Sequence, residues 1–256
     1  MGIIRGVIKN GLINFFGLDV KKFIPGSSPS AQLKVSLAKF NIDIVFDVGA
    51  NTGQFGKELR SSGYDGQIVS FEPLSEAYMH LKNLCDTDKK WTAHPRCAVG
   101  ERAGFVTINV AGNSASSSLL PMLDSHILAA PHTAYIGKEE VEIQMLDSII
   151  PGYLDGFKNP LLKIDTQGYE WAVLDGSKEV LSLMMGVVLE MSLVPLYEGQ
   201  HLWGEIIERL EGLGFSLWAL QPEFIDPCDG RTLQVNGIFY RNVDFCRSEA
   251  CFLERL

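Results

Sequence analysis

Three acidic residues each follow a short apolar run, and each is close to a turn-forming residue. Asp47 follows Ile44-Val-Phe, Glu72 follows Ile68-Val-Ser-Phe, and Asp165 follows Leu161-Leu-Lys-Ile. Because the carboxyl ends of parallel strands meet at one edge of a sheet, we expect these three carboxylates to gather there. Clustered carboxylates repel one another unless a cation or hydrogen-bond donors lie among them. The pattern therefore favours a site for a positively charged ligand or a metal ion.

The loop after the first apolar run contains two glycines, in the order Asp47-Val-Gly-Ala-Asn-Thr-Gly53. Glycines let the backbone approach a ligand, and the start of the following helix offers free N–H groups. A dinucleotide fingerprint needs glycines at its first, third and sixth positions, which here are Gly49, Asn51 and Gln54, and a phosphate loop needs Gly-Lys-Ser/Thr. Asp47 would attract an ammonium group and repel a pyrophosphate. S-adenosylmethionine, which has an ammonium, a sulfonium and no phosphate, fits this loop better.

Glu72 has the spacing of a ribose ligand. It lies 19 positions after Gly53, at the end of the next apolar run. Doubly wound folds place an acidic residue about 20 residues beyond the glycine loop, where it accepts hydrogen bonds from ribose hydroxyls. The sequence therefore predicts a nucleoside-containing ligand between these two loops.

Beyond residue 40, short apolar runs alternate with amphipathic segments, which is typical of a sheet with crossover helices. We predict strands at 44–46, 68–71, 161–164 and 187–191 and helices at about 53–62, 75–85, 169–182 and 201–213. Uniformly apolar strands are normally covered on both faces, as in a parallel sheet. Two alternating segments, 104–111 and 140–145, read as partly exposed strands, and 215–220 with 235–240 as an antiparallel end. The predicted fold is α/β, a Rossmann-like, doubly wound, mostly parallel sheet with an antiparallel end strand.

Length and charge narrow the classes of function. The chain has 256 residues, enough for one sizeable core, and a formal net charge of −9. A protein that coats nucleic acid needs a concentrated basic surface, so no nucleic-acid partner is expected. The five cysteines include no pair at the two-residue spacing of a zinc or redox motif. We therefore expect reduced thiols and a cytoplasmic protein.

The N-terminal segment 1–18 has apolar residues at helical spacing, with Arg5 and Lys9 elsewhere on the turn. Such a stripe usually packs on its own domain, and weak contact with a membrane surface is the alternative. Polar residues interrupt every apolar stretch before the about 20 residues that a membrane span needs. We predict a helical extension over residues 1–40 and one domain over 41–256.

The chain resembles the FkbM family of S-adenosylmethionine-dependent methyltransferases. The matching segments are Asp47–Gly53, Phe71-Glu-Pro73, Asn113–Leu119, 141–148 and Leu162–Glu170, with Leu174 and Gly176. The resemblance covers residues 44 to 241 and implies a class I methyltransferase fold. It implies methyl transfer, usually to a hydroxyl oxygen of a sugar or polyketide-type molecule. The family more often carries Val-Glu where this chain has Thr166-Gln167, so the resemblance supports no metal site there.

The resemblance also implies roles for individual residues. The implied cofactor-binding residues are Asp47, Gly49, Asn51, Gly53, Glu72, Pro73, Ala98, Val99 and Asp165. Of these, Asp47 would anchor the ammonium group of the methionine part, Glu72 would hold the ribose, and Asp165 would face the reacting methyl group. The pair Ala98-Val99 would lie against the adenine.

A methyl acceptor with a hydroxyl group needs a base to remove its proton. Asp165 is the first choice because of its implied position beside the methyl group. His126 and His132 lie in the insert between the two alternating strands, and the ordinary pKa of a histidine suits this task. Glu190, which ends the following strand, is a weaker candidate on the acceptor side. The expected acceptor is a small molecule or a glycan.

Two other classes of protein stay open at this point. A nicotinamide-dependent oxidoreductase would share the sheet and Glu72, although the glycine spacing counts against it. A non-catalytic protein that kept the fold is the other, and the joint presence of Asp47, Gly53, Glu72 and Asp165 argues against it.

Overall fold

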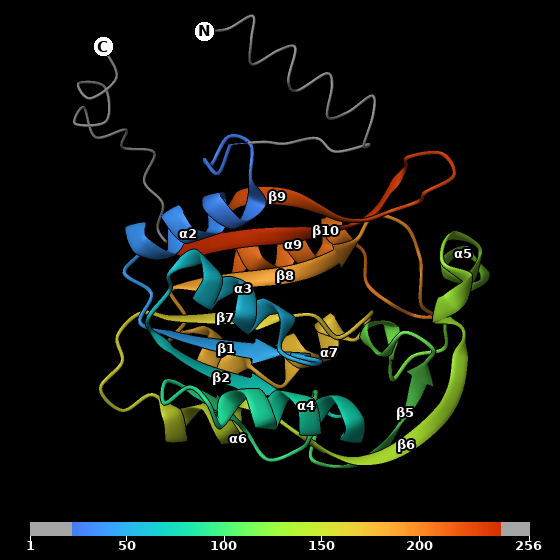
Figure 1. Cartoon of the computed structure of the whole chain (residues 1–256), viewed down its shortest axis with the longest axis horizontal. Coiled ribbons are helices and arrows are strands. Elements are labelled where there is room, and N and C mark those ends of the chain that lie inside the picture. Colours follow the sequence, from blue (N-terminus) through green and yellow to red (C-terminus); the bar gives the residue numbers. More distant parts are fainter. Residues whose placement is uncertain (1–21, 242–256) are drawn as a thin grey trace, which may run out of the picture.

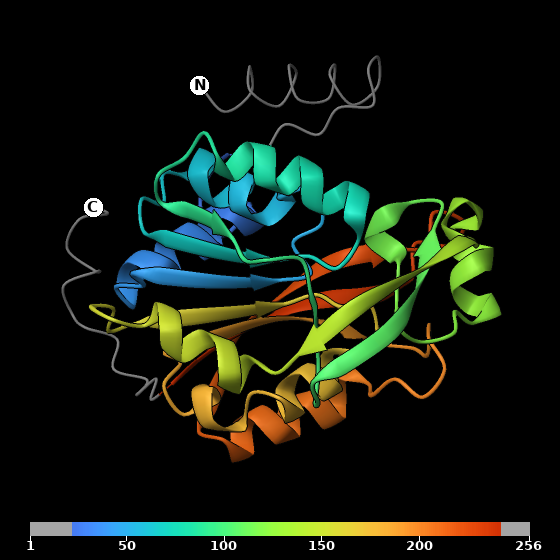
Figure 2. The same ribbon diagram turned by 90° about the horizontal axis from the view of Figure 1, so that it is seen from below.

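The computed structural model describes residues 22–241, and its centre is a seven-stranded sheet between two layers of helices (Figures 1 and 2). The strand order is β3-β2-β1-β7-β8-β10-β9. The bounds are β1 Ile44–Val48, β2 Gln67–Phe71, β3 Trp91–Ala93, β7 Pro160–Ile164, β8 Gly186–Ser192, β9 Phe215–Ile225 and β10 Thr232–Arg241. Strand β10 runs antiparallel to both β8 and β9, and the other strands of this sheet all run in one direction. The predicted α/β fold, a mostly parallel sheet with an antiparallel end, is confirmed.

Helices cover both faces of the sheet, as expected for strands that are apolar on both sides. One face carries α2 (Pro29–Lys39), α3 (Gln54–Ser62) and α4 (Ser75–Cys85). The other carries α6 (Leu146–Ile149), α7 (Glu170–Asp175), α8 (Lys178–Leu181) and α9 (Trp203–Gly212). The single helix predicted over 169–182 is two short ones. The break falls at Gly176 and Ser177; an added Cβ at Gly176 would lie 1.9 Å from the carbonyl oxygen of Gly100, so only glycine fits at this close approach.

Helix α2 belongs to the same core as the sheet. Ser28 caps it by accepting a hydrogen bond from the Ala31 N–H, and Pro29 stands at its first position. Leu33 and Leu37 are buried against the sheet. Residues 29–39 of the predicted extension thus pack on the domain, whereas 1–21, including the predicted membrane-surface segment, lie outside the described residues. Within 22–241, no helix has the length and apolar character to cross a bilayer.

A second, smaller sheet stands beyond the carboxyl edge of the first. It has the order β4-β6-β5, with β4 Ala98–Val99, β5 Gly104–Ala111 and β6 Tyr135–Gln144. Strands β5 and β6 each contain exposed and buried residues, which agrees with the partly exposed strands predicted from the sequence. Between these strands, an insert (112–134) contains η1 (Ser114–Ser116), α5 (Asp124–Ala129) and η2 (Pro131–Thr133). Figure 1 shows this insert in green at the end of the molecule toward which β1 points.

Candidate active site

A pocket of about 300 Å³ opens at the carboxyl edge of the main sheet. The ends of β1, β2 and β7 line it, together with part of the insert and residues of β8, β9 and β10. Among the predicted site residues, those that line it are Gly49, Asn51, Glu72, Pro73, Ala98, Val99 and Asp165. The edge at which the acidic residues were expected to gather is therefore the place where the pocket lies.

The loop after β1 is shaped by its glycines and by Asn51. Gly49 has φ +74°, and a Cβ there would lie 1.8 Å from the backbone oxygen of Asp165, so only glycine fits. Asn51 also has a positive φ, and its side-chain Nδ2 donates to Ser114 Oγ of the insert at 3.1 Å. Gly53 begins α3 at φ +83° under the ring of Trp91 and does not line the pocket. The position of Gly53 therefore does not support the predicted contact with the cofactor, and its left-handed backbone forms the turn into α3.

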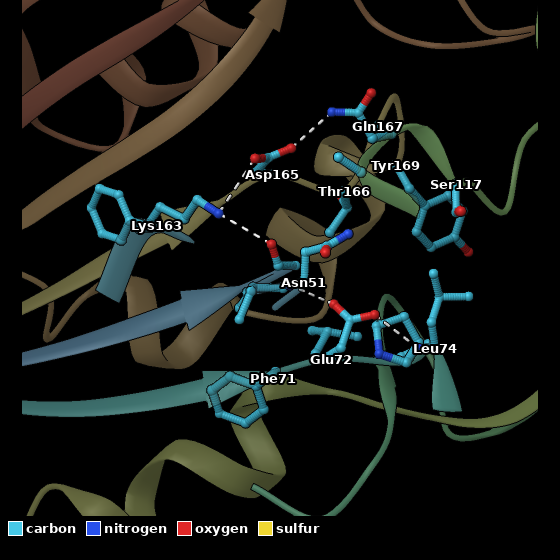
Figure 3. A pocket seen from close by; sticks show the side chains of 18 of the residues that line it. Asn51, Phe71, Glu72, Leu74, Ser117, Lys163, Asp165, Thr166, Gln167 and Tyr169 are labelled. Atoms are coloured by element: carbon cyan, nitrogen blue, oxygen red, sulfur yellow. Dashed lines mark hydrogen bonds and ion pairs between the residues drawn. The ribbon is translucent and has the colours of Figure 1, made fainter. Parts of the chain in front are cut away.

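Glu72 points its buried carboxylate toward this loop, as Figure 3 shows. Its Oε2 accepts from the Asn51 N–H at 2.7 Å, and its Oε1 accepts from the Leu74 N–H at 2.9 Å. Burial raises the pKa of Glu72 to about 7, although both backbone N–H groups lower it. Each oxygen keeps a further lone pair, because a carboxylate accepts about four hydrogen bonds. A pair of ligand hydroxyls can use them.

Asp47 does not have the place that the sequence predicts. Its side chain is fully buried beneath the loop and does not line the pocket. Its Oδ1 lies 3.1 Å from Lys163 Nζ, an ion pair without the angles of a hydrogen bond, and Ser70 Oγ donates to Oδ2 at 3.3 Å. The expected direct contact between Asp47 and an ammonium group is thereby corrected, since Lys163 already supplies the cation.

Lys163 links Asp47 to Asp165. Its Nζ lies 3.4 Å from Asp165 Oδ2 and donates to the carbonyl oxygen of Gly49 at 3.2 Å. Burial lowers the pKa of Lys163, but the two carboxylates outweigh burial and hold it above its ordinary value. The lysine is therefore charged, and it fixes the end of β7 against the loop after β1.

Asp165 presents its carboxylate to the pocket between two donors (Figure 3). Lys163 approaches one oxygen, and Gln167 Nε2 donates to the other, Oδ1, at 2.9 Å. One third of the side chain is exposed, in contrast to that of Asp47. Of the two acids beside Lys163, Asp165 is thus the one that a ligand in the pocket can contact.

The turn after Asp165 is held by Glu170, the first residue of α7. Its Oε1 accepts from the N–H groups of Thr166 at 2.9 Å and Gly168 at 3.0 Å. Burial raises the pKa of Glu170 to about 7 against these donors. Glu170 itself does not line the pocket, so its part is to shape the turn.

The opposite end of the pocket is apolar. Ala98 and Val99 of β4 lie there, each 4% exposed, beside Phe71, Ile108 and Leu119. Pro73 and Tyr169 complete this end. The surface suits a flat, weakly polar ring system.

The histidines proposed as bases lie elsewhere. His126 is buried in α5, packed against Tyr197 and Phe224, and its Nδ1 has no hydrogen-bond partner. Burial lowers its pKa to about 4, with a further contribution from His132. His132 is exposed in η2. Neither residue lines the pocket, so the prediction that they serve as the base is not supported by their positions.

Sequence reasoning missed several polar residues of the pocket, among them Lys163, Gln167, Glu223 and Asn236. A signal for Lys163 was present, because a single charge interrupts the apolar run Leu161–Ile164. Glu223 of β9 accepts from Asn236 Nδ2 of β10 at 2.9 Å, and no local motif marks either residue. Glu190, the weaker candidate, is buried and does not line the pocket.

These features fit S-adenosylmethionine and disfavour a dinucleotide. Glu72 has free acceptor capacity for two ribose hydroxyls, and the Ala98–Val99 end offers an apolar surface for adenine. The lone lysine among the lining residues is already neutralised by Asp47 and Asp165, which leaves no cation for a pyrophosphate. The exposed carboxylate of Asp165 suits a sulfonium.

The match to a protein-family model agrees with this assignment. Residues 47–217 match the model of the methyltransferase FkbM domain. A comparison with curated proteins finds no match. Similar solved structures include a putative RNA methyltransferase from Pyrococcus horikoshii, at 12% identity and a TM-score of 0.43 over 83% of this chain and 82% of that one. Another is magnesium protoporphyrin IX methyltransferase from Synechocystis PCC 6803 with bound SAM, at 10% identity and a TM-score of 0.45 over 93% and 96%.

The family match begins at Asp47 and spans both the loop after β1 and the turn that carries Asp165. Those are the two segments that Lys163 joins in the structure. The chain belongs to the FkbM family of methyltransferases, whose methyl donor is S-adenosylmethionine.

Proposed function

We propose that this protein transfers the methyl group of S-adenosylmethionine to a hydroxyl oxygen of a small molecule or glycan, of sugar or polyketide type. The observation that carries the proposal is the Asp165 carboxylate, which lies in the pocket between Lys163 and Gln167. A fixed carboxylate at the reacting end suits an acceptor that must lose a proton. The nicotinamide-dependent oxidoreductase left open by the sequence is set aside by the family membership.

The chain's own residues hold the donor in a defined direction. Glu72 would accept from the ribose hydroxyls, and Ala98 with Val99 would pack on the adenine. Gly49 and Asn51 would line the methionine part, where the backbone is close enough to touch it. When bound, S-adenosylmethionine supplies an electrophilic methyl group on a sulfonium. Alignment of this group with an acceptor oxygen contributes several kcal/mol to lowering the barrier.

Asp165 would act as the general base. The acceptor oxygen forms a bond to the methyl carbon as the sulfur–carbon bond breaks, and the hydroxyl proton passes to the Asp165 carboxylate. Lys163 and Gln167 keep that carboxylate in place, so little reorganisation is needed. A positioned base contributes about 10²–10⁴-fold to the rate.

Three further predictions from the sequence join this proposal without a test in the structure. They are the absence of a nucleic-acid partner, the cytoplasmic location and the weak membrane contact through residues 1–18. The last of these falls on residues that the structure does not describe.

The experiment compares Asp165→Asn with the wild type. The full-length protein is incubated with methyl-labelled S-adenosylmethionine and panels of saccharides and polyketide-type alcohols, and products are located by NMR. We expect a methyl ether, formed about 10²–10⁴-fold more slowly by Asp165→Asn. Binding of S-adenosylhomocysteine, measured by calorimetry, should change little. Asp155→Asn, an exposed acid outside the pocket, is the matched control.

Two results would contradict the proposal. Methylation on nitrogen or carbon would exclude the hydroxyl acceptor. An Asp165→Asn variant as fast as Asp155→Asn would exclude Asp165 as the base.

A further inference from the structure

Gln167 occupies an unusual position next to the reacting end of the pocket. It follows β7 in the left-handed region, with φ +54°, which a residue other than glycine rarely adopts. Its side chain is 8% exposed. Its backbone oxygen accepts from Ser118 Oγ of the insert at 2.6 Å. An unusual backbone conformation at a buried polar residue persists only where surrounding contacts hold it, and such residues are frequent at functional sites.

The side-chain amide of Gln167 is used completely. Its Nε2 donates to Asp165 Oδ1 at 2.9 Å and to Glu190 Oε2 at 2.6 Å, so both N–H groups meet carboxylates. Its Oε1 accepts from the hydroxyl of Tyr197 at 2.8 Å. The tyrosine donor fixes which end of the amide faces the two acids. Figure 3 shows this amide beside the Asp165 carboxylate.

We propose that Gln167 is a positioning residue for methyl transfer: its amide joins Asp165 to Glu190 and directs the Asp165 carboxylate into the pocket, toward the transferred group. The proposal rests on the function proposed above, in which Asp165 meets that group. A glutamate at this position would place three carboxyl groups together, and an apolar side chain would leave Asp165 without its second donor.

Glu190, the second carboxyl group that the Gln167 amide contacts, is buried and does not line the pocket. Its Oε2 accepts from both Gln167 and Gln234, at 2.6 and 2.8 Å. Burial raises its pKa well above the ordinary value. The carboxylates of Asp165, Glu170 and Glu223 add to this, and Lys163 opposes it. This direction favours the protonated form of Glu190, whereas Asp165 lies beside Lys163 and faces the pocket.

The test measures a ratio of two affinities. Calorimetry gives the dissociation constants of sinefungin, which has an ammonium group at the place of the methyl sulfonium, and of S-adenosylhomocysteine, whose sulfur at that place is an uncharged thioether. Contacts common to both ligands cancel in the ratio, which reports the negative charge that faces the transferred group. The wild type, Gln167→Met, Gln167→Glu and Asp165→Asn are measured between pH 6 and 9.

We expect the preference for sinefungin to fall by about three- to tenfold in Gln167→Met, because Asp165 is no longer directed into the pocket. In Gln167→Glu the ratio should become pH-dependent between pH 6 and 8, since an added carboxyl titrates next to Asp165. The control is Gln144→Glu, which should match the wild type. The Gln144 amide donates to Glu142, and both residues lie outside the pocket. Tyr197→Phe removes the donor that orients the amide and should also lower the ratio. It provides the test if Gln167→Met does not fold.

The outcomes separate this proposal from the proposed function. If Asp165→Asn lowers the ratio while Gln167→Met and Tyr197→Phe leave it unchanged, Gln167 is only structural and the present proposal is overturned. A ratio unaffected by Asp165→Asn would instead show that Asp165 does not face the transferred group, which overturns both.

Discussion

The affinity for S-adenosylhomocysteine should depend on pH through Glu72. The carboxylate is buried, and burial raises its pKa to about 7 in the unliganded protein. Ribose hydroxyls donate hydrogen bonds and so favour the ionised form. The ligand therefore binds the fraction of protein in which Glu72 is ionised. That fraction is about nine tenths at pH 8 and about one tenth at pH 6, which predicts binding about tenfold weaker, or about 1.4 kcal/mol, at pH 6.

Calorimetry across pH 5.5 to 8.5 measures this profile. Glu72→Gln should bind more weakly at pH 8 by about 1–3 kcal/mol and should lose the pH dependence, because its amide does not titrate in this range. Glu170→Gln removes the other acid whose pKa burial raises to about 7 without touching the pocket, and it should keep the profile. A flat profile in the wild type, or one retained in Glu72→Gln, would refute the reasoning.

The same group affects folding in the opposite sense. The folded-state pKa of Glu72 lies above that of an exposed glutamate, so its contribution to stability is complete below about pH 4.5 and is lost as the pH rises through 7. The shift corresponds to about 3 kcal/mol, as an order of magnitude. Because the ligand binds the ionised form of Glu72, the increase in melting temperature caused by S-adenosylhomocysteine should be larger at pH 8 than at pH 6.

Two further predictions concern the packing around the pocket. Gly49→Ala places a methyl group 1.8 Å from the Asp165 carbonyl oxygen at positive φ, and it should destabilise the protein by more than about 2 kcal/mol in chemical denaturation; Gly152→Ala, with nothing within 4 Å, should stay within about 0.5 kcal/mol. Equal effects would contradict the close approach. Lys163→Met leaves Asp47 buried without its cation and should cost about 3–5 kcal/mol, part of which the added Asp47→Asn recovers. No recovery in the double variant would show that the ion pair is not the cause.

Much of the fold follows from signals that lie within a dozen residues of one another. The apolar runs locate β1, β2, β7 and β8, and the order of runs and amphipathic segments predicts a mostly parallel sheet. Very short strands escape such signals, because β3 and β4 have three and two residues and depend on their neighbours for pairing. The division of 169–182 into α7 and α8 was not predicted either, because an isolated glycine such as Gly176 is tolerated inside a helical pattern.

The site divides in the same way. Glu72 and Asp165 were predictable because their position at a strand end determines where they lie. The pairing of Asp47 with Lys163 was not, because it follows from the register between β1 and β7, in which these two residues are partners. His126 and His132 were chosen by residue type alone, and type carries no information about distance. Asn236 lies in a predicted strand whose pocket-facing side the sequence does not indicate. Glu223 lies beyond the predicted strand 215–220, because β9 continues to Ile225.

The contact between Gly49 and the backbone of Asp165 has a consequence for changing the acceptor. Because the donor loop and the proposed base touch through main-chain atoms, a substitution in one displaces the other. The β9–β10 strands line another part of the pocket through Glu223 and Asn236, whereas the insert is bonded to the loop after β1 by Ser114 and to the turn after Asp165 by Ser118. Variation in acceptor range, by evolution or by directed libraries, should therefore be tolerated in Glu223 and Asn236, while the loop after β1 and Asp165 are kept unchanged.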